Sequence, residues 1–390
     1  MKFRRAVPGP VLMAILTSSL FLAMSPSGAS AADLRIQGRL SFWIGAHDRP
    51  VRELGLGLRY IPSLSLTKDL GRGLAVDVEA SANIYGSALG SSPSDAETSG
   101  AAKAYRLWVR LSTARFEARL GLQKINFGSA LLLRPLMWFD RLDPNDPLQL
   151  TDGVKGALLK YTFADNTNVW LWGLCGNDEV KGWETVPTRS REPEFGGRVQ
   201  TPVLSGEAAF TYHHRRMDPR RSLVPLPANE RSGASEDRIG LDGKWDVGPG
   251  VWFEAVLVRR DWSASPDRYQ RMLTLGIDGT LGLGNGLHLL AEHLVFDAAR
   301  EAFGPGTRRE LTGLSADLPL GILDRVRAAV FRDWTSRDWY RILTWQRTTD
   351  AWALFVIAFW NPDRYAIYAN RPETNLFSGQ GLQITLAYDH

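Results

Sequence analysis

The strongest constraint on this chain is a period-2 alternation of apolar and polar residues that recurs between residues 34 and 388. In its first segment the two sets separate cleanly, with Ile36, Leu40 and Phe42 against Arg35, Gln37 and Arg39. Successive side chains of a β-strand point to opposite faces, so the alternation predicts strands with one apolar and one polar face. The chain is therefore expected to be all-β.

The alternation predicts eighteen strands, with sixteen as the alternative because three of the segments alternate poorly. The predicted strands cover residues 34–45, 54–67, 74–85, 104–112, 116–128, 154–163, 168–175, 195–202, 207–215, 236–246, 251–260, 268–281, 287–297, 309–318, 325–334, 339–347, 351–360 and 380–388. The first three are longer than the roughly 5–6 residues usual in soluble sheets. Their length suits a tilted membrane strand of about 9–11 residues with its ends.

The connections between these strands sort by parity. The second, fourth and later even connections are tight, as at 68–73 and 113–115, whereas most odd ones are long and rich in Gly, Pro and charge, as at 86–103 and 129–153. Membrane barrels combine short periplasmic turns with long extracellular loops, while a sandwich or propeller has no reason to sort its loops in this way. We therefore predict a transmembrane, antiparallel, up-and-down β-barrel.

The first 31 residues have the pattern of a secretory signal peptide. A basic start with Lys2, Arg4 and Arg5 precedes an apolar stretch at 11–24, and Ala29-Ser30-Ala31 offers a cleavage site. The expected organisation is a signal peptide at 1–31 and one barrel domain at 32–390, with the cell outer membrane as the destination. A permanent membrane anchor is the alternative, but the apolar stretch is short for one. Cleavage would lower the formal net charge from +4 to +1.

Composition excludes several other classes of protein. A single cysteine, Cys175, rules out an internal disulfide framework and a cysteine-based zinc site. Mean hydropathy is −0.18, and beyond the first thirty residues no apolar run approaches the roughly 18 residues of a spanning helix. The nearly neutral mature chain gives no support to nucleic-acid binding. No cofactor or metal site is expected.

The final segment 381–388 carries Leu382, Ile384, Leu386 and Tyr388 on one face. Together with the signal peptide and the loop parity, it resembles Gram-negative outer-membrane porins and related export barrels. The stretch 119–128 is also similar to the R-x-G-x-Q-x-x-x-x-G strand of several porin-like families, including alginate-export barrels. The resemblance implies outer-membrane lipid around the barrel and recognition of the last strand by the barrel-assembly machinery. The segment 351–360 is apolar on both faces, which is compatible with a homotrimer.

If the apolar faces meet lipid, the opposite faces line the lumen, where basic side chains outnumber acidic ones. The predicted pore-lining residues are Arg35, Arg39, Arg59, Arg106, Arg110, Glu117, Arg119, Lys160 and Arg198. A cationic wall inside a low-dielectric cylinder concentrates anions, so a weak anion preference is expected. In the alternative interpretation, these arginines pair with lumen carboxylates, such as Glu254 and Glu292, and brace the wall.

The third odd connection, 129–153, is the third outer loop of the predicted barrel and is apolar and aromatic at its centre. Such a loop has little reason to lie in water, so we expect it to fold into the lumen as a constriction. Its charged residues would line the narrowest part: Arg134, Asp140, Arg141, Asp143 and Asp146. A surface loop packed on its own aromatics is the alternative.

Catalytic patterns are absent from the sequence: there is no G-x-S-x-G, H-E-x-x-H or Walker-type motif. The predicted function is passive diffusion of small hydrophilic or anionic solutes through a porin-like channel, without enzymatic activity. Two alternatives remain open. One is a polysaccharide-export or partner-filled conduit barrel, and the other is an outer-membrane enzyme such as a lipid hydrolase.

Overall fold

A computed structural model describes residues 32–48, 52–92, 94–140, 148–223, 234–262, 267–363 and 377–390. The expected signal peptide at 1–31 lies outside these residues. Helical structure in the described residues is limited to the 3-10 turn η1 (Pro219–Arg221) and a 3-10 residue at Phe377. No helix in the described ranges has the length and apolar character needed to cross a bilayer.

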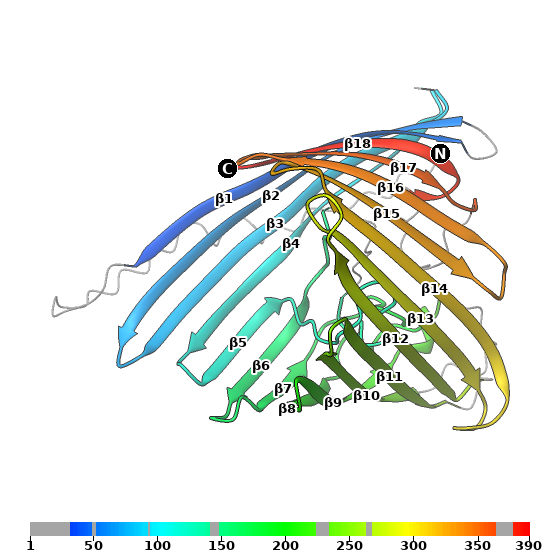
Figure 1. The fold of residues 1–390 in the computed structure, drawn as a ribbon. Coiled ribbons are helices and arrows are strands. Elements are labelled where there is room, and N and C mark those ends of the chain that lie inside the picture. Colours follow the sequence, from blue (N-terminus) through cyan, green and yellow to red (C-terminus); the bar gives the residue numbers. More distant parts are fainter. Residues whose placement is uncertain are drawn as a thin grey trace.

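Eighteen strands form one antiparallel sheet that closes on itself, as β18 pairs with β1 (Figure 1). The strands are β1 (Asp33–Asp48), β2 (Arg52–Gly71), β3 (Leu74–Gly90), β4 (Glu97–Ser112), β5 (Phe116–Gln123), β6 (Val154–Thr162), β7 (Asn168–Leu174), β8 (Glu194–Val203), β9 (Gly206–Met217), β10 (Ala234–Asp246), β11 (Gly250–Asp261), β12 (Tyr269–Leu281), β13 (Leu287–Ala299), β14 (Gly306–Pro319), β15 (Asp324–Asp333), β16 (Trp339–Thr348), β17 (Trp352–Trp360) and β18 (Gln380–Asp389). The predicted all-β, eighteen-stranded barrel is confirmed.

The connections follow the predicted parity. The even ones contain two to five residues, and the odd ones reach the opposite end of the barrel and include the long stretches 124–153 and 175–193. One long loop predicted from sequence, 86–103, is mostly strand. There β3 continues to Gly90 and β4 begins at Glu97, because the small residues of this hairpin keep pairing, with Ser87 hydrogen-bonded to Ser99 at 2.9 Å.

The predicted strand 116–128 ends early, at Gln123. From there the chain leaves the wall and turns into the barrel. Gly128, with φ of +100°, lies against the carboxylate of Glu254, and a Cβ at this position would collide with it. The left-handed conformation and the close approach both require glycine.

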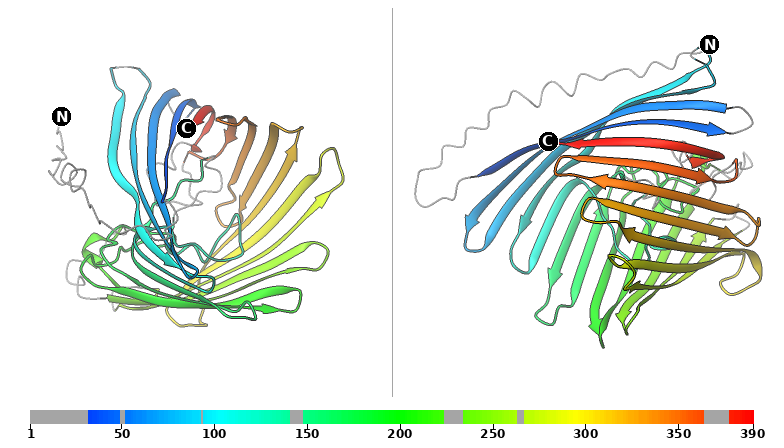
Figure 2. Two further views of the ribbon diagram at one scale, coloured as in Figure 1. Left: turned by 90° about the vertical axis from the view of Figure 1, so that its left-hand side faces the viewer. Right: turned by 45° about the horizontal axis from the view of Figure 1, so that its top comes forward.

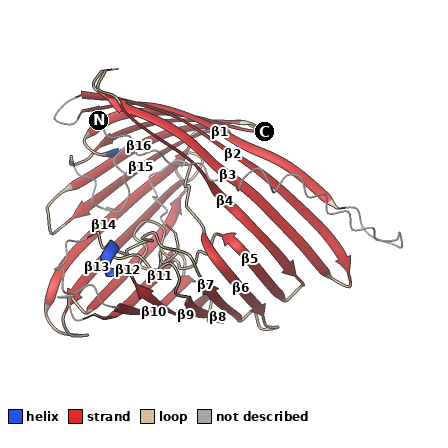
Figure 3. Cartoon of the chain, turned by 180° about the vertical axis from the view of Figure 1, so that it is seen from behind, coloured by secondary structure: helices blue, strands red, loops and turns tan. Residues whose placement is uncertain are grey.

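The two faces of the sheet differ sharply in exposure. Outward side chains are large, apolar and exposed, such as Ile36 at 73%, Leu56 at 50% and Leu275 at 55%. The register partners of Ile36 and Leu56 on neighbouring strands are apolar too, and exposed large apolar side chains occur on strands all around the sheet, so the outer surface is mainly apolar. The main hydrophobic cluster lies on the inner side instead, where loop segments enter the space that the strands surround (Figures 2 and 3).

The seam between β18 and β1 is held on both faces. Arg39 donates two hydrogen bonds to Asp389, with Nε to Oδ1 at 2.6 Å and Nη2 to Oδ2 at 2.8 Å. The ring of His390 stacks with the rings of Tyr60 and Tyr388, at centroid distances of 5.9 Å each. Three strands, β18, β1 and β2, are joined by these contacts.

Candidate functional site

The inner face of the barrel has two chemically different halves. Charged and hydroxyl side chains predominate on the inner face of β1–β6, which we call the polar half. The inner face of β13–β17, the apolar half, is aliphatic and aromatic at its centre. Its buried side chains include Leu290, Leu294, Leu311, Phe331, Tyr340, Ile342, Phe355, Ile357 and Phe359.

Residues 124–140, called here the inner segment, are anchored to the inner wall by two carboxylates. Glu292 on β13 accepts hydrogen bonds from the backbone N–H groups of residues 131, 132 and 133 at 2.5–2.9 Å. Glu254 on β11 accepts from the N–H groups of residues 130 and 136, at 2.8 and 2.9 Å. Trp252 Nε1 also donates to Glu292, at 3.0 Å. Both carboxylates are at most 1% exposed.

Apolar side chains of the inner segment pack in the same cluster as the apolar half of the wall. Leu133 is fully buried, and a Cβ at Gly313 would lie within 3.3 Å of both Leu132 and Phe331. The β17–β18 connection adds Phe377, whose ring meets that of Phe359 at a centroid distance of 5.6 Å. The apolar half is therefore covered by the protein itself.

An aromatic cluster holds the start and end of the inner segment. The ring of Phe127 lies 5.6–5.8 Å from those of Trp138, Phe139 and Trp172, and Trp172 Nε1 donates to His213 Nδ1 at 3.2 Å. These contacts fix the segment against β7 and β9 as firmly as the carboxylates fix it to β11 and β13.

The β7–β8 connection is tied down by a buried ionic network on the inner face of β8–β11. Its ion pairs are Lys181–Glu194 at 3.0 Å, Arg215–Glu184 at 3.2 Å, Arg238–Glu184 at 2.7 Å, Arg215–Glu236 at 2.7 Å and Arg260–Glu236 at 2.8 Å. Trp183 of this connection donates to the carbonyl of Arg134 at 2.8 Å. Two long connections therefore support each other inside the barrel.

The predicted constriction residues fall into two groups. Arg134 and Asp140 lie in the inner segment, are 6% and 2% exposed, and pair with each other at 3.5 Å. Arg134 also donates to the side chain of Asn126. Arg141, Asp143 and Asp146 lie outside the described residues.

The strand register places all nine predicted pore-lining residues on the inner face. Most of the cations pair with carboxylates: Arg35–Asp33 at 2.6 Å, Arg39–Asp389 at 2.6 Å, Arg110–Asp77 at 2.9 Å, Arg119–Glu117 at 2.9 Å and Arg198–Asp242 at 2.6 Å. These pairs match the bracing interpretation. Their part in conduction stays a prediction.

Three other predicted cations lie over aromatic rings. The guanidinium of Arg59 is 5.2 Å from the ring centroid of Tyr85, that of Arg106 is 4.0 Å from Tyr105, and Lys160 Nζ is 3.9 Å from Trp170. Among the described residues none of the three forms an ion pair with a carboxylate. Arg106 also donates to the backbone carbonyl of Thr151, at 3.0 Å. Rings and carbonyls are neutral partners, so the three cations leave net positive charge on the wall.

A cavity of about 620 Å³ lies between the polar half and residues 148–150. Its lining comprises Gln37, Gly38, Arg39, Ile61, Ser63, Glu79, Ser81, Tyr105, Leu148, Gln149, Leu150, Asp389 and His390. The inner segment thus occupies the apolar side of the lumen, whereas a polar space remains along β1–β4.

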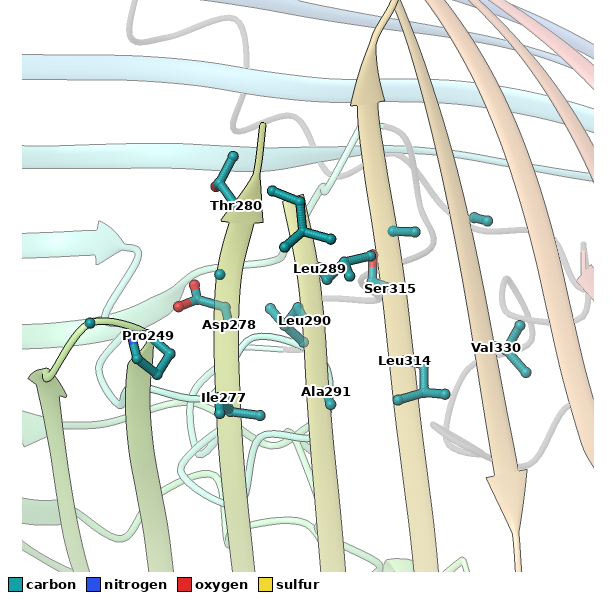
Figure 4. Close-up of a pocket in the computed structure, with 15 residues that line it drawn as sticks. Pro249, Ile277, Asp278, Thr280, Leu289, Leu290, Ala291, Leu314, Ser315 and Val330 are labelled. Atoms are coloured by element: carbon teal, nitrogen blue, oxygen red, sulfur yellow. The ribbon is translucent and has the colours of Figure 1, made fainter. Parts of the chain in front are cut away.

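A second hollow, of about 680 Å³, runs along β12–β15 (Figure 4). Most of its lining belongs to outward-facing rows, in which Ala291, Leu314 and Val330 are register partners. It is an apolar groove on the outer surface and is separate from the lumen.

Sequence reasoning placed Glu254 and Glu292 on the inner face but did not recognise them as anchors of the inner segment. A signal was available, because each carboxylate is flanked by large apolar residues in its inner row. Glu254 lies between Trp252 and Val256, and Glu292 between Leu290 and Leu294. An isolated acid in such a row needs a hydrogen-bond donor from elsewhere.

No protein-family model and no curated protein matches the sequence. Similar solved structures include the anion-selective porin from Comamonas acidovorans, with TM-score 0.50 and 13% identity over 92% of this chain and 100% of that one. OccK7 (OpdD) from Pseudomonas aeruginosa gives TM-score 0.57 and 10% identity over 92% and 99%. The outer-membrane protein OmpT of Vibrio cholerae, in its trimer form, gives TM-score 0.52 and 12% identity over 93% and 99%. In fold, the chain is a barrel of the Gram-negative outer-membrane porin type.

Proposed function

We propose that this protein is an outer-membrane, porin-like channel for passive diffusion of small hydrophilic solutes. The observation that carries the proposal is the polar cavity of about 620 Å³ inside a closed barrel whose outer surface is apolar. An apolar exterior suits hydrocarbon, and a polar interior suits water and dissolved solutes. The inner segment, which covers the apolar half, would confine solutes to the polar half.

The barrel would lie in the outer membrane in one fixed orientation. The short turns would face the periplasm, the long connections would face outward, and lipid would contact the apolar surface. Assembly would proceed through recognition of the last strand by the barrel-assembly machinery. A homotrimer is compatible with this arrangement, since one barrel of similar fold is described in a trimer form.

The proposed solute preference is weakly anionic. Paired arginines contribute little net field, since each faces its own carboxylate within 3 Å or so. Arg59, Arg106 and Lys160 retain net positive charge, and Arg59 and Lys160 are partly exposed to the lumen. Two or three net charges on one side of a lumen favour anions modestly, because salt screens them over about 8–10 Å.

Planar-bilayer recording of the purified protein tests the proposal. We expect stepwise currents and, in a potassium chloride gradient, a reversal potential displaced toward that of chloride. A reversal potential displaced toward potassium would refute the anion preference. A reconstituted barrel without conductance would refute the channel, and in that case a lumen partner or an enzymatic activity would be the function to seek.

A further inference from the structure

Within the polar half, one acidic side chain differs from its neighbours. Asp77 pairs with Arg110, Glu117 with Arg119 and Asp389 with Arg39. Glu79, two residues from Asp77 on the same face of β3, forms no ion pair with any described residue, although it lines the cavity beside residues 148–150. Because these neighbouring acids are neutralised by arginines, the Glu79 carboxylate is the acidic group that stays available to a solute in the cavity.

The backbone next to Glu79 is shaped to enlarge the polar lining. Across the β3–β4 pair, Ser81 faces Arg106 while Ala82 faces Ala104, so Tyr105 is an extra residue in β4. This bulge lets Tyr105 line the cavity next to the inward-facing Arg106. Bulges of this kind re-aim side chains near functional sites.

Besides the mutually paired Arg39 and Asp389, the lining offers neutral hydrogen-bonding groups around the Glu79 carboxylate. Hydroxyls come from Ser63, Ser81 and Tyr105, and amides from Gln37 and Gln149. The volume of about 620 Å³ lies in the range of ordinary small-molecule pockets, about 300–1,000 Å³. One carboxylate cannot supply the six or more oxygen ligands of a calcium ion. Within the described ranges no group of three or more metal-ligating side chains exists either.

We infer that the cavity beside Glu79 is a binding subsite for a solute that carries a cationic amine among hydroxyl groups, as an amino sugar does. The ammonium group would donate charge-assisted hydrogen bonds to Glu79, and the hydroxyl groups would exchange hydrogen bonds with Ser63, Tyr105 and Gln149. The inference deepens the proposed function and rests on it.

This subsite and an overall anion preference do not conflict, because they act over different distances. The net charge of the wall biases the entry of small ions. The Glu79 carboxylate acts at contact distance on a group that has already entered. A neutral polyol and an amino sugar of the same size would therefore experience different retention in the same lumen.

Isothermal titration calorimetry on the detergent-solubilised full chain tests the inference without requiring conduction. The probes are glucosamine, N-acetylglucosamine and glucose. We expect glucosamine to bind about tenfold more tightly than the other two, and E79Q to remove that advantage. Asp33→Asn serves as the matched control, since Asp33 is an inner-face acid outside the cavity that pairs with Arg35, and it should keep the advantage.

Equal affinity for the three sugars in the unmodified protein would overturn the inference, and this comparison needs no variant. Preference for glucosamine that survives in a folded E79Q protein would overturn it as well. Binding of glucosamine by a barrel that shows no conductance would refute the channel and leave the subsite standing. Conductance without discrimination among the sugars would do the reverse.

Discussion

The polar and apolar halves of the lumen have the same strand geometry but different inner faces: one is polar and open to the lumen, and the other is apolar and covered by protein. Strands of the polar half alternate apolar and polar residues. Their apolar face forms part of the outer surface, and their polar face lines the lumen. Strands such as β17 carry apolar residues on both faces, with Phe355 and Ile357 inside and Leu354 and Val356 outside. An apolar inner wall needs a cover, and the chain supplies one from its own connections. The infolded connection therefore covers the apolar half of the inner wall and leaves the polar half open to the cavity.

The largest expected effect follows from cutting the anchors of that cover. In the double variant Glu254→Ala with Glu292→Ala, five backbone N–H groups lose their acceptors. Each buried orphan costs about 1–3 kcal/mol, so the free energy of unfolding should fall by several kcal/mol. We also expect larger and noisier single-channel currents. Urea unfolding and bilayer recording measure the two effects.

Glu207→Ala is the control for this double variant, because its exposed carboxylate accepts from Gln200, at 2.6 Å, and from no other residue that the structure describes. It should leave stability and conductance nearly unchanged. If the anchor variant behaved like this control, the inner segment would be held by apolar packing alone, and the two carboxylates would have no anchoring role.

A smaller loss of unfolding free energy is expected when apolar packing between the inner segment and the wall is removed. Leu133 is fully buried against the wall, so Leu133→Ala should lower the free energy of unfolding by about 2–5 kcal/mol without changing ion selectivity. Leu275→Ala removes the same atoms from an outward position that is 55% exposed, and should cost less. Equal losses for the two variants would argue against a packed cover over the apolar half.

Substitution of cations in the polar half should change the ion selectivity of the channel and should hardly change the free energy of unfolding. Arg59→Gln combined with Lys160→Gln removes cations that have no carboxylate partner among the described residues, so the reversal potential should move toward cation preference by several millivolts. Arg110→Gln exposes Asp77 as well, since it breaks their 2.9 Å pair. A shift from the single variant that is as large as the shift from the double variant would contradict the division into bracing and field-setting cations.

The smallest effect is expected outside the wall. Arg221 donates to Asp178 at 2.6 Å, and this hydrogen bond lowers the pKa of the Asp178 carboxyl. Because the folded pKa is depressed, the stabilisation is present above the ordinary pKa and is lost as pH falls through the folded value. Both side chains are about half exposed, so Asp178→Asn should cost under about 1 kcal/mol. Chemical unfolding at neutral pH and below pH 3 measures the difference, which should vanish in acid.

Local sequence pattern predicted the wall well, because alternation and loop parity are properties of neighbouring residues. The predicted ends of most strands lie within a few residues of the observed ones, as for 207–215 against β9 and 351–360 against β17. The early end of β5 was not predicted. It depends on Gly128 meeting Glu254, which is more than a hundred residues away in sequence.

The candidate site was predictable only in part, for the same reason. The faces of Arg39, Arg110 and Arg119 follow from alternation, but the carboxylate partners of Arg39 and Arg110 depend on which residues the register sets side by side. The infolding of the connection 129–153 was predicted from its apolar and aromatic sequence. The apolar neighbours of Glu254 and Glu292 marked them as acids that need a hydrogen-bond donor, but the donors could not be named, because backbone N–H groups carry no sequence signature.

The two-sided contact at the seam has a consequence for the order of folding. Arg39 and Asp389 are separated by 350 residues, so their hydrogen bonds form only after the ends of the sheet have met. Contacts between residues this distant in sequence slow folding, because the entropy cost of closing a long loop comes before the contacts stabilise the chain. Pairing of β1 with β18 is therefore expected to be the last step, and Arg39→Ala should slow the appearance of the closed barrel while leaving earlier hairpins unaffected.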